Sequence, residues 1–134
     1  MYLLDTNVLS ELLRKRPNAG VMTRIQALTY EDTFASIVTL FELRYGAMRR
    51  EDATEFWTRI QQQIVIATQW LPADVEVAQR AGDITASLER VGQSIGTEDI
   101  FIGATALQHN LTMVSRNAGH FSRIPGLRVE NWFT

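Results

Sequence analysis

The sequence predicts an α/β fold in which helices cover both faces of a mostly parallel central sheet, forming a three-layer α/β/α sandwich. Two observations predict this class. Short apolar runs suited to buried strands alternate along the 134 residues with longer segments of helical periodicity. No repeat or linker-like stretch interrupts this order, so residues 1–134 are expected to form a single domain. Strands separated by helices in this way favour parallel pairing.

The expected strands are short. The first, Tyr2–Leu4, begins almost at the N-terminus and ends at Asp5. The others are expected at residues 33–36, 69–71, 111–115 and 127–129. In sheets of this type, ligands bind beyond the carboxyl ends of the strands. Residues that follow a strand are therefore the first candidates for a functional site.

Helices are expected where apolar residues recur every three or four positions. Asn7 is expected to cap the first helix, which ends near Pro17, and Asn18 to start the second. Further helices are expected from residue 37 to about 50, from 52 onward, from 74 to 91, and from a capping Thr97 to about 110. The apolar helices around Phe41, Phe56 and Ile60 are expected to carry more apolar surface than one core needs, and any excess would serve a dimer or a groove for a partner's helix.

Composition excludes several kinds of protein. There is no cysteine, which rules out disulfides and thiolate metal sites and fits a reducing cytoplasm. Neither a signal peptide nor a membrane-spanning run is visible, so a soluble cytoplasmic protein without membrane contact is expected. The net charge of −2 does not suit a generic nucleic-acid binder.

The distribution of charge is more informative than its total. Residues 51–99 carry nine acids against three arginines, whereas the rest of the chain is basic. Arginine suits bidentate contacts with phosphate. Six basic residues are candidates for contacts with RNA phosphates or an acidic partner, although each can equally be ordinary solvated charge: Arg14, Lys15, Arg16, Arg44, Arg49 and Arg50.

Three acidic side chains and an amide fall where one edge of the sheet can gather them. Asp5 directly follows the first strand, and Glu42 lies in the second turn of the helix after the second strand. Asp99 lies in the first turn of its helix, and Asn117 follows the fourth expected strand by two residues. These four residues, distant in sequence, are the candidate catalytic group.

Converging carboxylates repel one another, so something must neutralise them. No lysine lies beside any of the three acids, since Lys15 is the only one in the chain, and a divalent cation is the economical solution. Oxygen ligands select Mg²⁺ or Mn²⁺, whereas zinc favours cysteine and histidine. Mg²⁺ held by Asp5, Glu42 and Asp99 would suit phosphodiester hydrolysis.

Each acid also has an ordinary structural role open to it. Asp5 can be a turn or capping residue after a strand. Glu42 stands three residues after Thr39, which matches a capping box. Asp99 would stabilise any helix whose first turn it occupies. Taken singly, these roles explain the acids as well as catalysis does.

Four segments, in this order, resemble motifs of the PIN-domain family, especially its bacterial VapC-type toxins. The first three contain Asp5, Glu42 and Asp99 respectively. They are LDTNVL (residues 4–9), SIVTLFELRYG (36–46), IGTEDIFIGA (95–104) and LTMVSRN (111–117), the last followed by Phe121 and PGLRVENW (125–132). The similarity spans nearly the whole chain and implies a PIN-like fold.

The resemblance also implies a function. It implies a metal-dependent endoribonuclease that acts on RNA as the toxin of a toxin–antitoxin pair, is restrained by a cognate antitoxin protein, and forms a homodimer. One departure stands out, because many PIN domains carry a fourth acid where this sequence has Asn117. With three carboxylates, one well-held metal is expected. Three further residues are open candidates for the catalytic group, because they lie next to its members in the sequence. Glu98 is adjacent to Asp99, and Ser115 and His120 lie within three residues of Asn117.

Two other functions share parts of this pattern. A phosphotransfer module also places an acid after its first strand, but it requires an acidic pair or a late lysine, and Asp5-Thr6-Asn7 with the single Lys15 meets neither requirement. A non-catalytic RNA- or protein-binding module of the same fold is the stronger alternative. Such a protein would be expected to lose at least one of the three acids, and this chain keeps them all.

Overall fold

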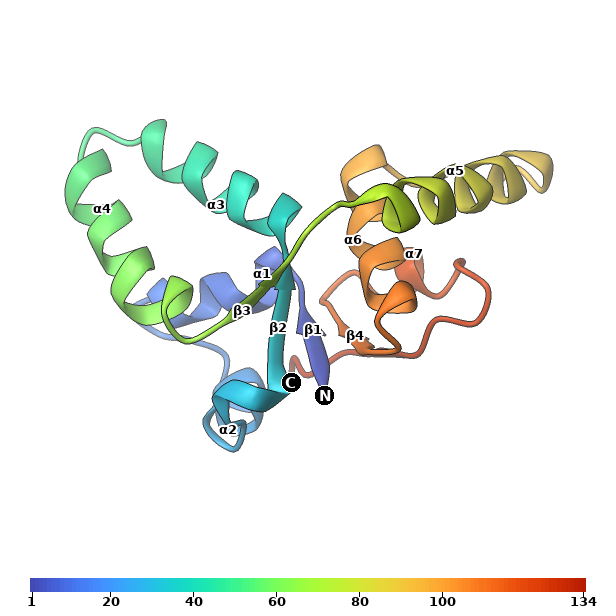
Figure 1. The fold of residues 1–134 in the computed structure, drawn as a ribbon. Coiled ribbons are helices and arrows are strands. Elements are labelled where there is room, and N and C mark those ends of the chain that lie inside the picture. The colour runs from blue at the N-terminus through green and yellow to red at the C-terminus, as the bar shows by residue number, and fades with distance from the viewer.

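A five-stranded parallel sheet forms the centre of the computed structural model, which describes residues 1–134 (Figure 1). The strands lie in the order β3-β2-β1-β4-β5, and every neighbouring pair is parallel. Their bounds are Tyr2–Leu4 (β1), Thr33–Ser36 (β2), Gln69–Leu71 (β3), Thr112–Val114 (β4) and Val129–Glu130 (β5). The predicted α/β fold class is thus confirmed, and the last strand begins two residues later than expected.

Helices connect the strands and flank the sheet. The longer ones are α2 (Ala19–Gln26), α3 (Ile37–Met48), α4 (Ala53–Ile60), α5 (Val75–Arg90) and α6 (Thr97–Gln108). Shorter turns are α1 (Thr6–Leu9), the 3₁₀ turns η1 (Ser10–Leu13) and η2 (Tyr30–Asp32), the π-helical turn η3 (Gln61–Val65) and α7 (Ala118–Phe121). Figure 1 shows α5, α6 and α7 on one side of the sheet and α1, α2 and α4 on the other.

The core has two halves, one on each face of the sheet. Successive side chains of a strand point to opposite faces. Leu3 and Met113 accordingly pack with the buried residues of α5 and α6. Leu4 and Val114 pack with those of α1, α2 and α4. This alternation along β1 and β4 produces the three layers.

Two of the expected helix caps are wrong and two are confirmed. Asp5, not Asn7, caps α1, because its carboxylate accepts the hydrogen bond from the Thr6 N–H at 2.8 Å. Gly96, not Thr97, precedes the first turn of α6. Asn18, as expected, caps α2 by accepting from the Val21 N–H at 3.2 Å. The start of the helix expected from residue 74 is also confirmed, as the Asp74 carboxylate accepts from the first turn of α5.

The strand order locates the edge at which a site is expected. From β1 the chain proceeds outward through β2 to β3, and it then returns to place β4 on the other side of β1. The order therefore reverses between β1 and β4, and such reversals leave a crevice at the carboxyl ends of the strands. In Figure 1, α3 leaves β2 at this edge and α6 begins beside it. No helix is both long enough and apolar enough to cross a membrane.

Candidate active site

Asp5 lies where β1 ends, at the point of strand-order reversal, and the residue is only 4% exposed. The Ser115 hydroxyl, at the end of β4, donates a 2.7 Å hydrogen bond to Asp5 Oδ2. Asn7 Nδ2 donates to the same oxygen at 3.3 Å, while Asn7 Oδ1 accepts the Arg116 N–H at 3.1 Å. Two elements that are far apart in sequence but adjacent in the sheet thus fix the orientation of this carboxylate.

Glu42 reaches the same edge from the second turn of α3. The Thr6 hydroxyl, one residue beyond Asp5, donates a 2.6 Å hydrogen bond to Glu42 Oε1. Thr39, fully buried one turn before Glu42, places its hydroxyl 3.2 Å from Thr6 Oγ1. The alternative role for Glu42 in a capping box is not realised, because Ser36 caps α3 through the Val38 N–H.

Asp99 enters from the first turn of α6, as expected. Its Oδ2 lies 3.9 Å from His120 Nδ1, which comes from α7. Glu98 precedes it in the same turn. The part that Thr6 plays was not predictable from the sequence, since 36 residues separate it from Glu42.

Asn117 reaches the site by its backbone. Its N–H donates to Ser115 Oγ at 2.9 Å, so the Ser115 hydroxyl accepts from Asn117 and donates to Asp5. The Asn117 side chain makes no hydrogen bond within the protein. Its predicted catalytic role stays a prediction.

Known proteins are similar to this chain both in sequence and in fold. The family model of the PIN domain matches residues 2–127. The chain belongs to the PIN-domain family. Among similar proteins, Toxin FitB of Neisseria gonorrhoeae is 37% identical to this PIN domain over 126 residues, covering 90% of this chain and 91% of FitB. The tRNA(fMet)-specific endonuclease VapC of Salmonella typhimurium is 32% identical, covering 98% and 97%.

Solved structures share the whole PIN-domain fold of this chain. The FitAcB structure from N. gonorrhoeae superposes with a TM-score of 0.91 and 35% identity, covering 98% of this chain and 97% of that one. The DNA-bound VapBC structure from S. typhimurium gives 0.87 and 29%, covering 98% and 97%. The expected resemblance to VapC-type toxins of toxin–antitoxin systems is therefore confirmed.

Burial and neighbouring charges raise the pKa of all three acids of this PIN domain. Burial raises the pKa of Asp5 to about 6, and the charges of Asp99 and Glu42 add to this, whereas the hydrogen bonds from Ser115 and the Thr6 N–H oppose it. Burial, followed by the charges of Asp99 and Glu98, raises the pKa of Glu42 against the opposing Thr6 hydrogen bond. Burial and the charge of Glu98 likewise raise the pKa of Asp99, against the effect of His120.

The charge of Asp99 raises the pKa of both Asp5 and Glu42, and the charge of Glu42 raises the pKa of Asp5, although the three acids come from separate elements. No three acidic or histidine side chains approach closely enough in this structure to enclose an ion by themselves. The donor set nevertheless suits a hard divalent cation, because every candidate ligand is a carboxylate oxygen. A bound cation would also offset the repulsion between carboxylates, which adds to the effect of burial on the pKa values of Asp5 and Glu42.

Proposed function

We propose that this protein is a Mg²⁺-dependent endoribonuclease that acts as the toxin of a toxin–antitoxin pair. Asp5, Glu42 and Asp99 would hold the ion, and Mn²⁺ would be able to replace Mg²⁺. The observation that carries the proposal is the gathering of three carboxylates, from the end of β1, from α3 and from α6, at the point of strand-order reversal. The charge of Asp99 raises the pKa of both Asp5 and Glu42, which supports their proximity. The names of the relatives support the activity, since several are VapC ribonucleases or endonucleases.

A bound Mg²⁺ supplies an activated water and positive charge that stabilises the phosphodiester transition state. The protein's own residues orient the carboxylates that would hold the ion. Ser115 and Asn7 keep Asp5 aligned through its Oδ2, and Thr6 aligns Glu42. The side-chain amide of Asn117 makes no hydrogen bond within the protein. It would order a water or a phosphate oxygen without adding charge.

The proposed partners follow from the relatives. Similar solved structures are VapBC assemblies, which form a family of toxin–antitoxin systems, and two of them are bound to DNA. We propose that this chain likewise binds a cognate antitoxin protein, which restrains its RNA cleavage. We also propose that the protein forms a homodimer, with the outer face of α3 as the interface.

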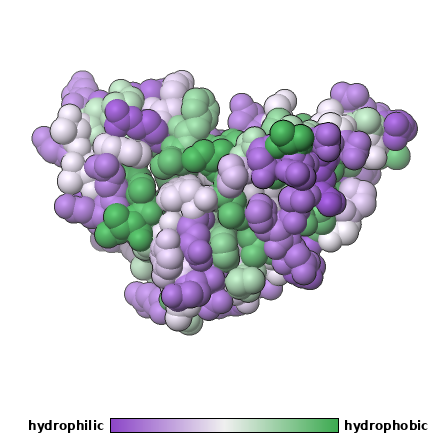
Figure 2. All heavy atoms as spheres, in the orientation of Figure 1, coloured by the Kyte–Doolittle hydropathy of each residue, from purple (hydrophilic) through white to green (hydrophobic).

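That face of α3 is apolar yet exposed. Its members are Ile37, Phe41, Tyr45 and Met48, which are 40–61% exposed. Phe41 and Tyr45 stack with their ring centroids 6.3 Å apart. Figure 2 shows hydrophobic residues gathered where α3 approaches the start of α5. Exposed apolar patches of this kind mark protein interfaces, and a second copy of the chain would cover this one.

The decisive experiment separates catalysis from binding. The protein, purified free of any partner and stripped of metal with EDTA, is incubated with cellular RNA and purified tRNA, with and without added Mg²⁺ or Mn²⁺. We expect internal cleavage with either ion, none in EDTA, and none from Asp5→Asn. Absence of RNA cleavage with both ions would contradict the proposed ribonuclease activity. Growth arrest on expression that persists in Asp5→Asn would instead favour the alternative, a non-catalytic binding module.

A further inference from the structure

A hollow of about 500 Å³ adjoins the proposed cleavage site. Thr6 and Glu42 line one end of it, so it is continuous with the acidic edge. From there it extends between η1 on one side and α3 and α4 on the other. Its apolar lining consists of Leu13, Leu43, Ala47, Phe56 and Ile60.

Basic side chains dominate the polar lining of this hollow. They are Arg14, Lys15, Arg50 and Arg59, whereas Glu42 is the one acid among the lining residues. Arg50 is paired with Asp52, through contacts of 2.7 and 3.0 Å. No carboxylate lies within 4.0 Å of the cationic nitrogens of Lys15 or Arg59. Two positive charges in the hollow therefore form no ion pair.

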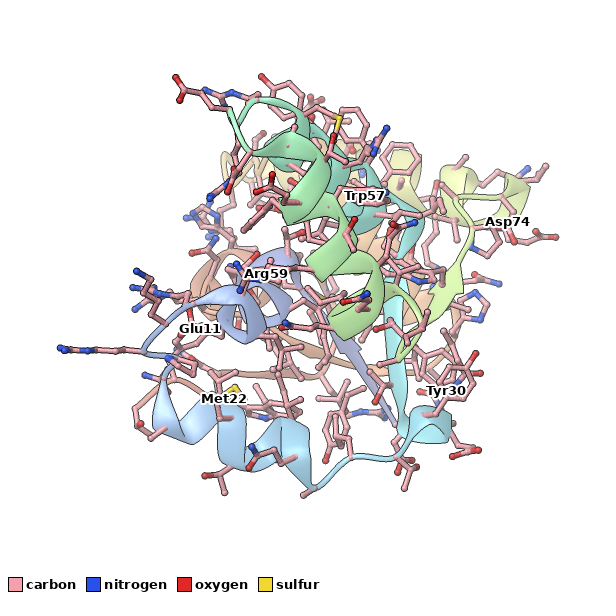
Figure 3. The ribbon with its side chains drawn as sticks, turned by 90° about the vertical axis from the view of Figure 1, so that its left-hand side faces the viewer. Glu11, Met22, Tyr30, Trp57, Arg59 and Asp74 are labelled. Atoms are coloured by element: carbon pink, nitrogen blue, oxygen red, sulfur yellow. The ribbon has the colours of Figure 1, made fainter.

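The guanidinium of Arg59 is held in place by contacts with η1 and with Phe56. Its Nη2 donates a 2.9 Å hydrogen bond to the Leu13 carbonyl, which ties α4 to η1. Its guanidinium lies 5.5 Å from the centre of the Phe56 ring, and Arg50 lies 3.8 Å from the same ring. Figure 3 shows Arg59 on α4 next to the segment that carries Glu11. A guanidinium fixed in this way loses less conformational entropy when it binds an anion.

This charge is a local property of the hollow. The chain as a whole carries −2, so its overall field does not attract RNA. A second hollow, of about 410 Å³ beside α5, has Arg80 in its lining together with Glu76 and Asp83. Of these two hollows, only the one next to the cleavage site has cationic side chains in excess of acids.

We infer that Lys15 and Arg59 bind the phosphates of the RNA strand beside the bond that is cut, and that the hollow accepts a single strand. This inference rests on the proposed ribonuclease function. RNA is favoured over an acidic peptide because the hollow opens directly onto the acids proposed to hydrolyse phosphodiesters. An RNA strand whose scissile bond lies at the three acids must extend beyond them on either side. The phosphates next to the scissile bond need nearby positive charge to offset repulsion by the three carboxylates.

Binding of a fluorescent single-stranded RNA of roughly ten nucleotides, measured by anisotropy in EDTA, tests the inference without cleavage. Lys15→Gln combined with Arg59→Gln is expected to weaken binding roughly tenfold or more at low salt. The dependence of log Kd on log salt should flatten by about 0.7 for each phosphate that is no longer neutralised. Arg80→Gln combined with Arg90→Gln, an equal change of charge on α5, is the matched control and should change neither quantity.

Folding is monitored by thermal unfolding. Because Arg59 also contacts Leu13, the exposed single variant Lys15→Gln and the charge-preserving Arg59→Lys provide independent readings. Lys15→Gln should flatten the salt dependence by about 0.7, and Arg59→Lys should leave it unchanged.

Two results would overturn the assignment of the hollow to RNA. One is unchanged RNA affinity in the double variant, and the other is a loss of affinity for poly-L-glutamate alone, which would make the hollow an acidic-peptide site. Cleavage by the parent protein in Mg²⁺, assayed separately, distinguishes failure of this inference from failure of the proposed function. A parent protein that neither cuts nor binds RNA would refute both.

Discussion

The Ser115 hydroxyl and the Asp5 carboxylate are joined by a 2.7 Å hydrogen bond, although 110 residues separate them in the chain. Both are buried, and each directly follows one of the two central strands, β4 and β1. Because Ser115 Oγ also accepts the Asn117 N–H, its proton is directed at Asp5. Ser115 is therefore a positioning residue for the acid at the centre of the site.

Ser115→Ala should shift the acidic limb of the cleavage–pH profile upward. The hydrogen bond from Ser115 lowers the pKa of Asp5 against the effect of burial. Without it, more of the carboxyl is protonated near neutral pH, and the limb is expected to move by about one pH unit. Cleavage rates measured from about pH 5 to 9 test this. Ser122→Ala, an exposed serine, is the control, and superposable profiles for both variants would contradict the role of Ser115.

Thr6→Val should weaken metal activation. The variant keeps the shape of the side chain but removes the 2.6 Å hydrogen bond to Glu42. A hydrogen bond to a charged group contributes about 1.5–3 kcal/mol, so the Mg²⁺ concentration for half-maximal cleavage should rise about tenfold or more. Thr58→Val, which loses only a hydroxyl contact with the Thr54 carbonyl, is the matched control. Equal Mg²⁺ requirements in the two variants would refute the role of Thr6.

The metal-free protein should be less stable at about pH 7.5 than at about pH 5. The pKa of Asp5 is raised in the folded state, from 3.8 to about 6, so in this range the folded protein binds more protons than the unfolded chain. The free energy of unfolding therefore falls as pH rises from about 5 through the folded pKa of about 6, by about 1.4 kcal/mol from Asp5. Urea unfolding in EDTA measures it. Asp5→Asn should flatten the trend, and a rise in stability over the same pH interval would contradict it.

Gly20→Ala should destabilise the fold through the C-terminal segment. A Cβ at this position would lie 2.5 Å from the backbone carbonyl of Trp132 and 2.5 Å from Thr134 Cγ2. Relief requires movement of the backbone, at a cost of about 1–3 kcal/mol. Gly82→Ala in α5 meets no atom within 4 Å and should instead stabilise by about 0.5–1 kcal/mol. Thermal unfolding that ranks the two variants in the opposite order would refute this packing.

Phe41→Lys should separate the proposed homodimer. Phe41 is 61% exposed at the centre of the apolar face of α3, and a lysine there would place a charge in the buried contact. Light scattering after size exclusion should give twice the 15.2 kDa chain mass for the parent protein and the single mass for the variant. Val91→Lys, 65% exposed at the end of α5, should remain dimeric. A monomeric parent protein would exclude this interface.

The sequence by itself determined the fold class and the strands, and it predicted the three candidate acids. Those features are local, because strand and helix periodicities repeat within a few residues. Asp5 directly follows a strand, and Glu42 and Asp99 lie within the first two turns of their helices. Local patterns were less reliable at the caps. Asn7 and Asp5 are both good capping residues two positions apart, and only the backbone path after β1 selects Asp5.

The tertiary structure decided how these parts act on one another. Pairing of β1 with β4 brings Ser115 to Asp5, and the packing of α3 against the sheet brings Glu42 to Thr6. The raised pKa values arise from burial and from charges on separate elements, which no spacing in the chain encodes. The basic hollow likewise depends on tertiary contacts, since η1, α3 and α4 all line it and Arg59 of α4 donates a hydrogen bond to the Leu13 carbonyl of η1. Contacts between distant residues depend on packing of the whole domain, so they could not be read from local sequence.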